Sequence, residues 1–93
     1  MDARIEPGSV WKEADPRVER YVRILAAPDG QGGISRLPGF DGFVTLGKVM
    51  IQKIDIATLE PCAGARPTAA KPERFNGKRG GYSLHSSANL ASA

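Results

Sequence analysis

The side chains that most often carry out chemistry in proteins are scarce in this sequence of 93 residues. Cys62 is the only cysteine and His85 the only histidine. Cys62 lies in a stretch rich in Pro, Ala and Gly, where no predicted helix N-terminus would activate its thiol. A structural zinc site normally needs four Cys or His ligands, and these two residues cannot supply them. The sequence therefore predicts a protein that is not an enzyme and holds no metal.

The carboxylates and the glycine-rich stretches give no stronger signal of a ligand site. Asp29, Asp41 and Asp55 lack the spacing of an EF-hand or a Walker motif. Residues 30–33 and 77–81 are rich in glycine, but neither stretch opens a helix after a strand, as loops that cradle phosphate do. We therefore expect no cofactor.

Positive charge is the remaining chemical signal, and it is concentrated in the last third of the chain. Residues 1–65 carry eight Lys and Arg against nine Asp and Glu, whereas residues 66–93 carry five cations against Glu73 alone. Basic side chains on a glycine-rich loop can follow a phosphate backbone, and an exposed tyrosine can stack on a base. The candidate residues for binding nucleic acid or another partner are Arg66, Lys71, Arg74, Lys78, Arg79 and Tyr82.

Other interpretations of this basic segment remain open. The same cations would suit an acidic protein surface. They could also be solvated charges, with Arg74 paired to Glu73 or another acid and with Phe75 and Tyr82 in the core. The sequence does not decide among these alternatives.

The segment that must organise the fold is residues 43–59, the densest run of Val, Ile, Leu and Met. Its second half alternates, which predicts a strand with Met50 and Ile54 on the covered face and Ile51 on the wetter one. Gly47 interrupts the run, so we expect one long strand bent there or two strands in a hairpin.

The rest of the chain predicts further short strands joined by turns. Residues 18–27 alternate, with Val22 and Ile24 expected to point inward. Trp11, beside a turn, is expected to anchor the core. Shorter extended segments are expected at residues 34–37, 66–70 and 82–85. Residues 73–75 should form one 3₁₀ turn after Pro72, with Phe75 tucked inward.

Length and composition fit one small domain. We expect a lead-in at residues 1–9, a β domain at residues 10–85 and a flexible tail at residues 86–93. No apolar run approaches the roughly 20 residues that a membrane-spanning helix needs, and the N-terminus lacks the pattern of a signal peptide. A single cysteine makes the reducing cytoplasm the expected compartment.

Several short motifs resemble a family. The opening Trp11 followed after three residues by Asp15-Pro16-Arg17, and the closing Glu73-Arg74-Phe75 with Gly81-Tyr82, are similar to a group of short phage and bacterial proteins. The resemblance implies a small, partly open SH3-like or KOW-like barrel with long loops, and a phage or mobile-element origin in a bacterial host. This sequence departs from the group by a longer middle, residues 31–62. The resemblance brings no activity with it.

Two functional hypotheses follow. The first is a small, non-enzymatic protein that binds nucleic acid through its basic C-terminal loop. The alternative is a phage protein-interaction factor, either an inhibitor of a host defence complex such as an anti-CRISPR protein or a small virion component. Neither hypothesis involves a membrane, and the sequence leaves the oligomeric state open.

Overall fold

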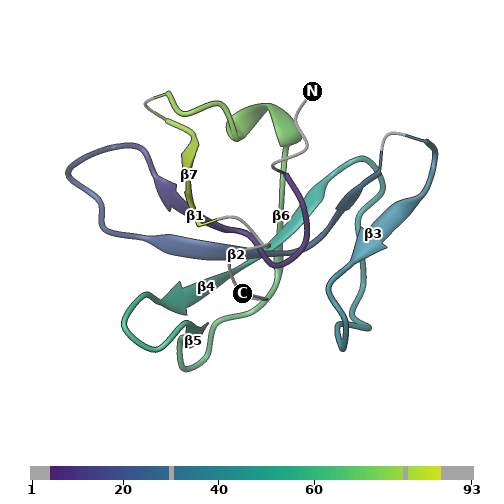
Figure 1. The fold of residues 1–93 in the computed structure, drawn as a ribbon, viewed down its shortest axis with the longest axis horizontal. Helices are drawn as coiled ribbons and strands as arrows, with labels where there is room; N and C mark the ends of the chain where they lie inside the picture. Colours follow the sequence, from purple (N-terminus) through teal and green to yellow (C-terminus); the bar gives the residue numbers. More distant parts are fainter. Residues whose placement is uncertain (1–4, 30, 79, 87–93) are drawn as a thin grey trace.

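The computed structural model of the chain describes residues 5–29, 31–78 and 80–86, and they adopt a mainly β fold. All strand pairs are antiparallel, and the helical structure among these residues is a single 3₁₀ turn. The elements, shown in Figure 1, are β1 (Val10–Glu13), β2 (Tyr21–Pro28), β3 (Ile34–Arg36), β4 (Val49–Asp55), β5 (Glu60–Pro61), β6 (Thr68–Ala70), η1 (Pro72–Arg74) and β7 (Tyr82–Ser86).

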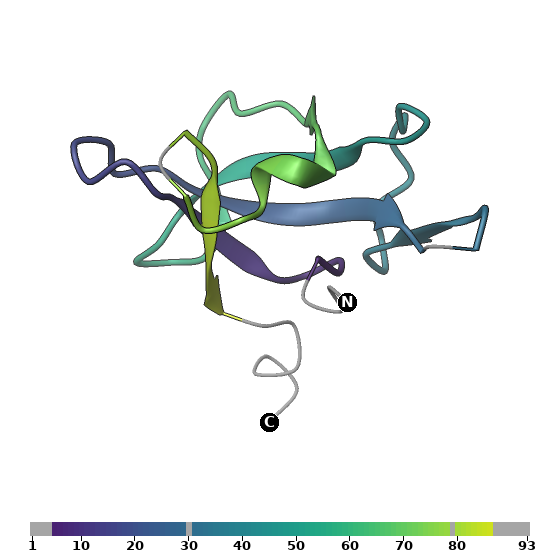
Figure 2. The same ribbon diagram turned by 90° about the horizontal axis from the view of Figure 1, so that it is seen from above.

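One sheet connects all seven strands, and five of them follow the order β5-β4-β2-β1-β7. β3 pairs with the end of β2, and β6 pairs with the start of β4. The 3₁₀ turn η1 then takes the chain from β6, beside β4, to β7, beside β1, and lies across one face of the sheet (Figures 1 and 2). The predicted fold class is therefore confirmed: a small, partly open β-barrel with long loops.

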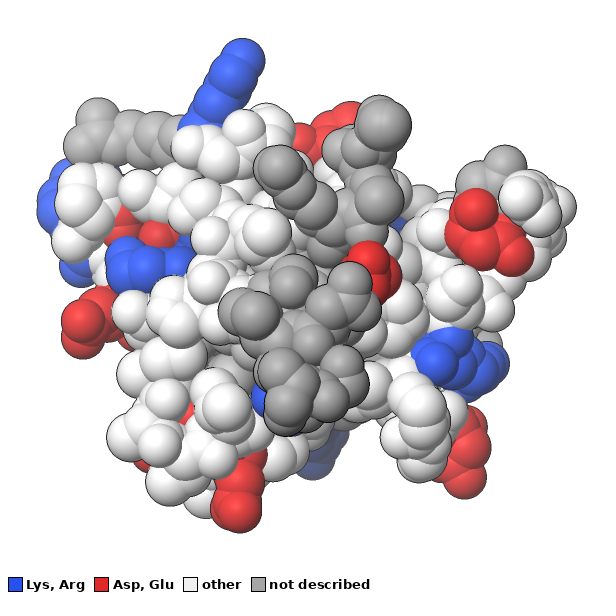
Figure 3. Space-filling view, viewed as in Figure 1, with Lys and Arg blue, Asp and Glu red and all other residues white. Residues whose placement is uncertain are grey.

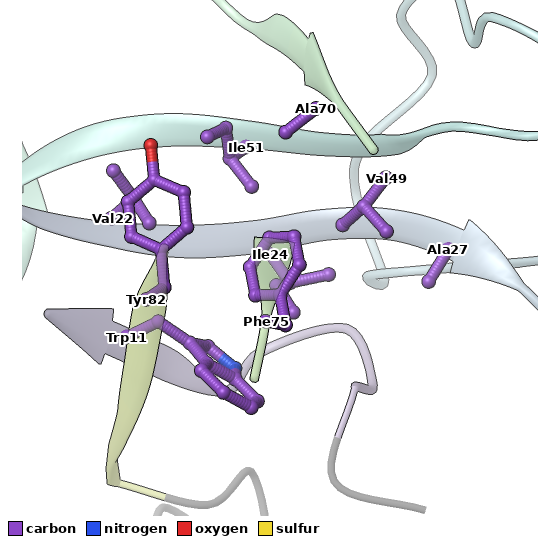
Figure 4. Packing of buried hydrophobic residues seen from close by; sticks show 9 residues of the cluster. All are labelled: Trp11, Val22, Ile24, Ala27, Val49, Ile51, Ala70, Phe75 and Tyr82. Carbon is purple, nitrogen blue, oxygen red and sulfur yellow. The ribbon is translucent and has the colours of Figure 1, made fainter. Parts of the chain in front are cut away.

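The main core lies between this sheet face and η1. Trp11 meets Phe75 edge-on with ring centroids 5.0 Å apart, and Phe75 stacks on Tyr82 at 5.1 Å. Figure 4 shows these rings directed toward the aliphatic side chains of β2 and β4. The predictions that Trp11 anchors the core and that Phe75 is buried are confirmed. The whole cluster consists of Trp11, Val22, Ile24, Ala27, Val49, Ile51, Ala70, Phe75 and Tyr82.

A second, smaller cluster covers the other face of β2 and β4 at one end of the barrel. Leu25, Ala26 and Met50 form it, and partly buried apolar residues of the β3–β4 connection pack against them. As a result, Met50 and Ile51 are both buried, each with 5% exposure. The prediction that Ile51 lies on the wetter side of its strand is therefore wrong, because both faces of β4 are covered here.

The predicted strand at residues 43–59 is too long in both directions. Regular pairing is confined to Val49–Asp55. Residues 43–48 form a loop that ends in a turn, where the backbone N–H of Lys48 donates to the carbonyl of Thr45 at 3.1 Å. Gly47 has a φ of 77°, so it belongs to this turn and not to a bend within a strand.

The N-terminal half of the barrel also differs from the prediction. β2 begins at Tyr21 because a turn precedes it, in which the N–H of Val18 donates to the carbonyl of Asp15 at 3.0 Å. Val22 and Ile24 point inward as predicted. The strand β1 was not predicted, since only its first two residues are apolar, yet it lies between β2 and β7 and pairs with both.

The structure describes part of the predicted lead-in, residues 5–9, and the first residue of the predicted tail. Ile5 packs against the core and Ser9 is buried, so the end of the predicted lead-in contributes to the domain. Of the predicted tail, Ser86 ends β7, and residues 87–93 lie outside the described part of the chain. No helix in the described ranges is long and apolar enough to span a bilayer.

Candidate nucleic-acid interface

The basic segment folds as a tight connection between β6 and β7, which we call the closing loop (residues 71–81). Lys71 is extended and precedes η1, and Pro72 occupies the first position of the turn. The N–H of Arg74 donates to the carbonyl of Lys71 at 3.0 Å, and that of Phe75 to the carbonyl of Pro72 at 3.1 Å. Because this turn directs Phe75 into the core, Lys71 stays exposed at its start.

Hydrogen bonds within the closing loop also hold Lys78 in place. The side-chain amide of Asn76 donates to the carbonyl of Glu73 at 2.9 Å and accepts from the N–H of Lys78 at 2.8 Å. The N–H of Gly81 donates to the carbonyl of Lys78, also at 2.8 Å. The N–H and the carbonyl of Lys78 are therefore both hydrogen-bonded, while its side chain is exposed. Arg79, the neighbouring candidate, lies outside the described residues.

Arg74 has a different position from the one predicted for a binding residue. Its Nε and Nη2 donate to the carbonyl of Gly80 at 3.3 and 3.1 Å, and its guanidinium carbon lies 4.9 Å from the centroid of the Tyr82 ring. Among the described residues it forms no ion pair with Glu73 or another acid. Arg74 thus stabilises the closing loop through its bonds to the Gly80 carbonyl, and it forms no ion pair with a carboxylate of the described residues.

Tyr82 is not available as a stacking platform. It is only 4% exposed and lies in the core, with Phe75 against one part of its ring and Arg74 against another. The side chain faces inward because β7 alternates and the first residue of the strand lies on the core side. The prediction that an exposed Tyr82 contacts a base is therefore wrong, and the alternative that it belongs to the core is correct.

Arg66 is separated from the rest of the predicted patch. It precedes β6, whereas Lys71 follows it, and β6 runs from one end of the barrel toward η1 (Figure 1). At about 3.3 Å per extended residue, the two Cα atoms are roughly 16 Å apart. The structure therefore brings together Lys71, Arg74 and Lys78 but leaves Arg66 elsewhere.

Besides Glu73 within the closing loop, two acids beside the loop are bonded to cations of the β1–β2 segment. The N–H of Ala14 donates to the carbonyl of Gly81 at 2.9 Å, which places the turn after β1 beside the loop. Arg17 bonds Asp15 at 2.9 Å, and this hydrogen-bonded pair raises the pKa of the Arg17 guanidinium above its usual value. Glu13, on the same side, bonds Arg20 at 3.0 Å.

The surface charge as a whole does not form one continuous basic field. Figure 3 shows Lys and Arg interspersed with Asp and Glu around the outline of one face. Exposed surface cations contact a polyanion best where no carboxylate compensates them. Among the described residues Arg66, Lys71 and Lys78 are all exposed without an ion pair, and Lys71 and Lys78 share the closing loop.

Two features of the surface were not identified from the sequence. Tyr21 and His85 make an edge-to-face contact on the outer face of the sheet, with centroids 5.2 Å apart. The predicted alternation of residues 18–27 placed Tyr21 opposite the core, and this was the available signal; no inward side was predicted for residues 82–85. Phe43 and Leu46 are 82% and 84% exposed on the β3–β4 loop, although the apolar pattern had suggested a strand there.

A hollow of about 460 Å³ lies beside the closing loop. Ile5, Trp11, Pro72 and Leu84 contribute apolar surface to it, and Glu73 and Asn76 contribute polar groups. Within the described ranges, no three His, Cys, Asp or Glu residues come together as metal ligands would. Comparison with protein-family models, curated proteins and solved structures yields no match to this chain.

Proposed function

We propose that this protein is a small, non-enzymatic binding module that contacts the phosphate backbone of nucleic acid through its closing loop. The observation that supports the proposal is the exposure of Lys71 and Lys78 on the closing loop, without an ion-paired acid among the described residues. Arg79 is adjacent to Lys78 in the sequence and adds a third cation. The resemblance of the opening and closing motifs supports a phage or mobile-element origin.

The expected interaction is electrostatic and insensitive to sequence. Each cation that neutralises a phosphate releases condensed counterions, so the affinity falls as salt rises. Three contacts from Lys71, Lys78 and Arg79 give a log–log slope of roughly −2 to −3. Arg74 supports the loop through the Gly80 carbonyl and is not counted among these contacts.

The experiment is a titration of a labelled DNA fragment at several salt concentrations between about 50 and 200 mM. The double variant Lys78→Gln/Arg79→Gln should bind more weakly and reduce the magnitude of the slope by about 1.5 to 2. Arg66→Gln is the matched control, because it also removes an exposed cation but lies away from the closing loop. The absence of binding at low salt, or an equal effect of the control, would contradict the proposal.

The alternative function, a phage protein-interaction factor, is favoured by a separate observation. Phe43 and Leu46 are two large apolar side chains, three positions apart, that project from the β3–β4 loop almost fully exposed. Neighbouring exposed apolar residues of this kind are typical of protein docking surfaces. The partner would be a host defence complex, as for an anti-CRISPR protein, or another virion protein.

The two functions can be separated with one pair of variants. In a host lysate treated with nuclease, a protein partner should remain bound in fixed stoichiometry to the wild-type chain. Phe43→Ser/Leu46→Ser should release it, whereas Lys78→Gln/Arg79→Gln should retain it. The opposite pattern, together with salt-dependent binding of DNA, would favour the nucleic-acid function.

A further inference from the structure

The outer face of the sheet carries a cluster of aromatic and cationic side chains from three adjacent strands, which we call the outer-face cluster: Lys12, Tyr21 and His85. Lys12 of β1 stands opposite Tyr21 of β2 and Ser83 of β7 in the strand registers. Its Nζ lies 5.9 Å from the Tyr21 ring centroid, and the Tyr21 and His85 rings are 5.2 Å apart at an angle of 84°. The three strands thus bring together residues far apart in the sequence.

The cluster lies on the side of the sheet opposite the main core. Trp11 and Val22, the neighbours of Lys12 and Tyr21 along their strands, belong to that core. His85 is exposed, and Lys12 and Tyr21 are partly exposed. The ring of His85 is fixed on one side by Tyr21 and at its edge by Ser86, whose Oγ lies 2.9 Å from Nδ1. Its ring is therefore oriented while remaining accessible.

Two cations share this face of the sheet with the rings. Arg23 follows Tyr21 by two residues, so both project from the same face of β2. Its Nη1 donates to the carbonyl of Leu59 at 3.2 Å, and no acid of the described residues forms an ion pair with it. Lys12 likewise donates to a backbone carbonyl, that of Glu13, at 3.3 Å. One cation without a carboxylate partner among the described residues, Lys12, therefore lies against the Tyr21 ring, and Arg23 lies farther along the same face of β2.

This combination matches the chemistry of an unpaired nucleotide. A base offers a flat π-face that stacks on aromatic side chains, histidine included, and its phosphate attracts neighbouring cations. In a duplex the faces of the bases are stacked on one another, so a duplex can contact the cations through its phosphates but cannot stack a base on the protein's aromatic rings. We propose that the outer-face cluster is a base-stacking site for single-stranded nucleic acid. This inference rests on the proposed function and specifies its substrate class.

A ring pair on a sheet also stabilises the strands that carry it, so the test must separate stacking from folding. His85→Ala removes the accessible ring, whereas His85→Phe keeps a flat π-face at the same position. Thr68→Ala, at an exposed position of β6, is the control for a small truncation on the surface. Denaturation midpoints of all variants in urea establish that the fold is retained.

The experiment measures the affinity of a labelled oligothymidylate and of a duplex of equal length at about 50 mM salt. His85→Ala should weaken single-strand binding about tenfold, as the loss of one base–aromatic stack does, and change duplex binding by less than about twofold. His85→Phe and Thr68→Ala should bind the single strand like the wild type. A 2-aminopurine base in the oligonucleotide should be quenched by the wild type and less by His85→Ala.

The outcomes distinguish the stacking site from the proposed function. If the wild type binds both nucleic acids with the expected salt dependence but His85→Ala binds them equally well, the stacking site is wrong and the proposed function stands. Equal weakening of single-strand and duplex binding also overturns the stacking site. If the wild type binds neither nucleic acid, both proposals are wrong.

Discussion

The buried pair of Ser9 and Trp11 offers a stability test whose magnitude follows from the contacts. The Ser9 side chain is 0% exposed, and its hydroxyl donates to the carbonyl of Glu6 at 2.6 Å. The same oxygen accepts the indole N–H of Trp11 at 3.0 Å. Ser9→Ala therefore removes the acceptor of a donor that is itself buried.

We expect Ser9→Ala to cost about 2 to 4 kcal/mol of unfolding free energy. An unsatisfied buried N–H accounts for about 1 to 3 kcal/mol, and the lost bond to Glu6 for about 0.5 to 1.5. In a Trp11→Phe background no indole N–H remains, so only the second contribution should be lost. The coupling between the two substitutions should then be about 1 to 3 kcal/mol, with the double variant more stable than additivity predicts.

The assay is a double-mutant cycle measured by urea denaturation. Far-UV circular dichroism follows unfolding in all four proteins, since Trp11→Phe removes the only tryptophan. Trp11→Phe is itself destabilising, because it leaves space in the core, but the cycle cancels that contribution. Additivity within about 0.5 kcal/mol would show that the Trp11 N–H does not depend on Ser9, and would refute the reasoning.

Three other substitutions test the turns. Gly81→Ala should lower the melting temperature by several degrees, at a cost of about 1 to 3 kcal/mol, because the added Cβ would collide with the carbonyl oxygen of Arg74. Leu59→Gly should raise the free energy of unfolding by up to about 1 kcal/mol, and the urea midpoint with it, because Leu59 has a φ of 63°, a conformation that costs a residue with a Cβ more than glycine. The N–H groups of Gln31 and Gly33 lower the pKa of Asp29. Its carboxylate should therefore stabilise the fold above its unfolded pKa of about 3.9, and this stabilisation should be lost as the pH falls through the lowered value. Asp29→Ala should make the free energy of unfolding, measured by urea denaturation, depend less on pH in this acidic range.

The sequence predicted the parts of the fold that depend on local patterns. Alternation identified the inward side of β2 through Val22 and Ile24, and Pro72 marked the start of the 3₁₀ turn that buries Phe75. β1 was missed because two apolar residues are too few to show a period. It is a strand nevertheless, because β2 and β7 supply pairing partners on both of its edges.

The errors around β4 have a different cause. A period of two assumes that one face of a strand is covered, but Met50 packs under the β3–β4 connection while Ile51 packs in the main core. Phe43 and Leu46 extended the apolar run although neither is buried. Apolar composition alone does not separate a residue of the core from an apolar residue displayed on a loop.

The candidate site was predictable in composition but not in arrangement. The excess of cations in residues 66–93 indicated the closing loop, and Lys71 and Lys78 are exposed there. The inward position of Tyr82 and the bond of Arg74 to the Gly80 carbonyl depend on where η1 packs against the sheet. That packing joins the last strand to the first, and no local pattern encodes it.

The two proposed contact regions are both consequences of how β7 closes the barrel. The strand alternates, so Tyr82 and Leu84 face the core side while Ser83 and His85 face outward. Its first residue fixes the closing loop through the bond from the Gly77 N–H to the Tyr82 carbonyl at 2.8 Å, and its outward side completes the cluster with Tyr21. A nucleic acid that used both regions would have to follow β7 from the rim to the outer face. Loss of the ring at His85 and loss of charge at Lys78 should then weaken single-strand binding by factors that multiply, because the two groups are separate and each contacts a different nucleotide.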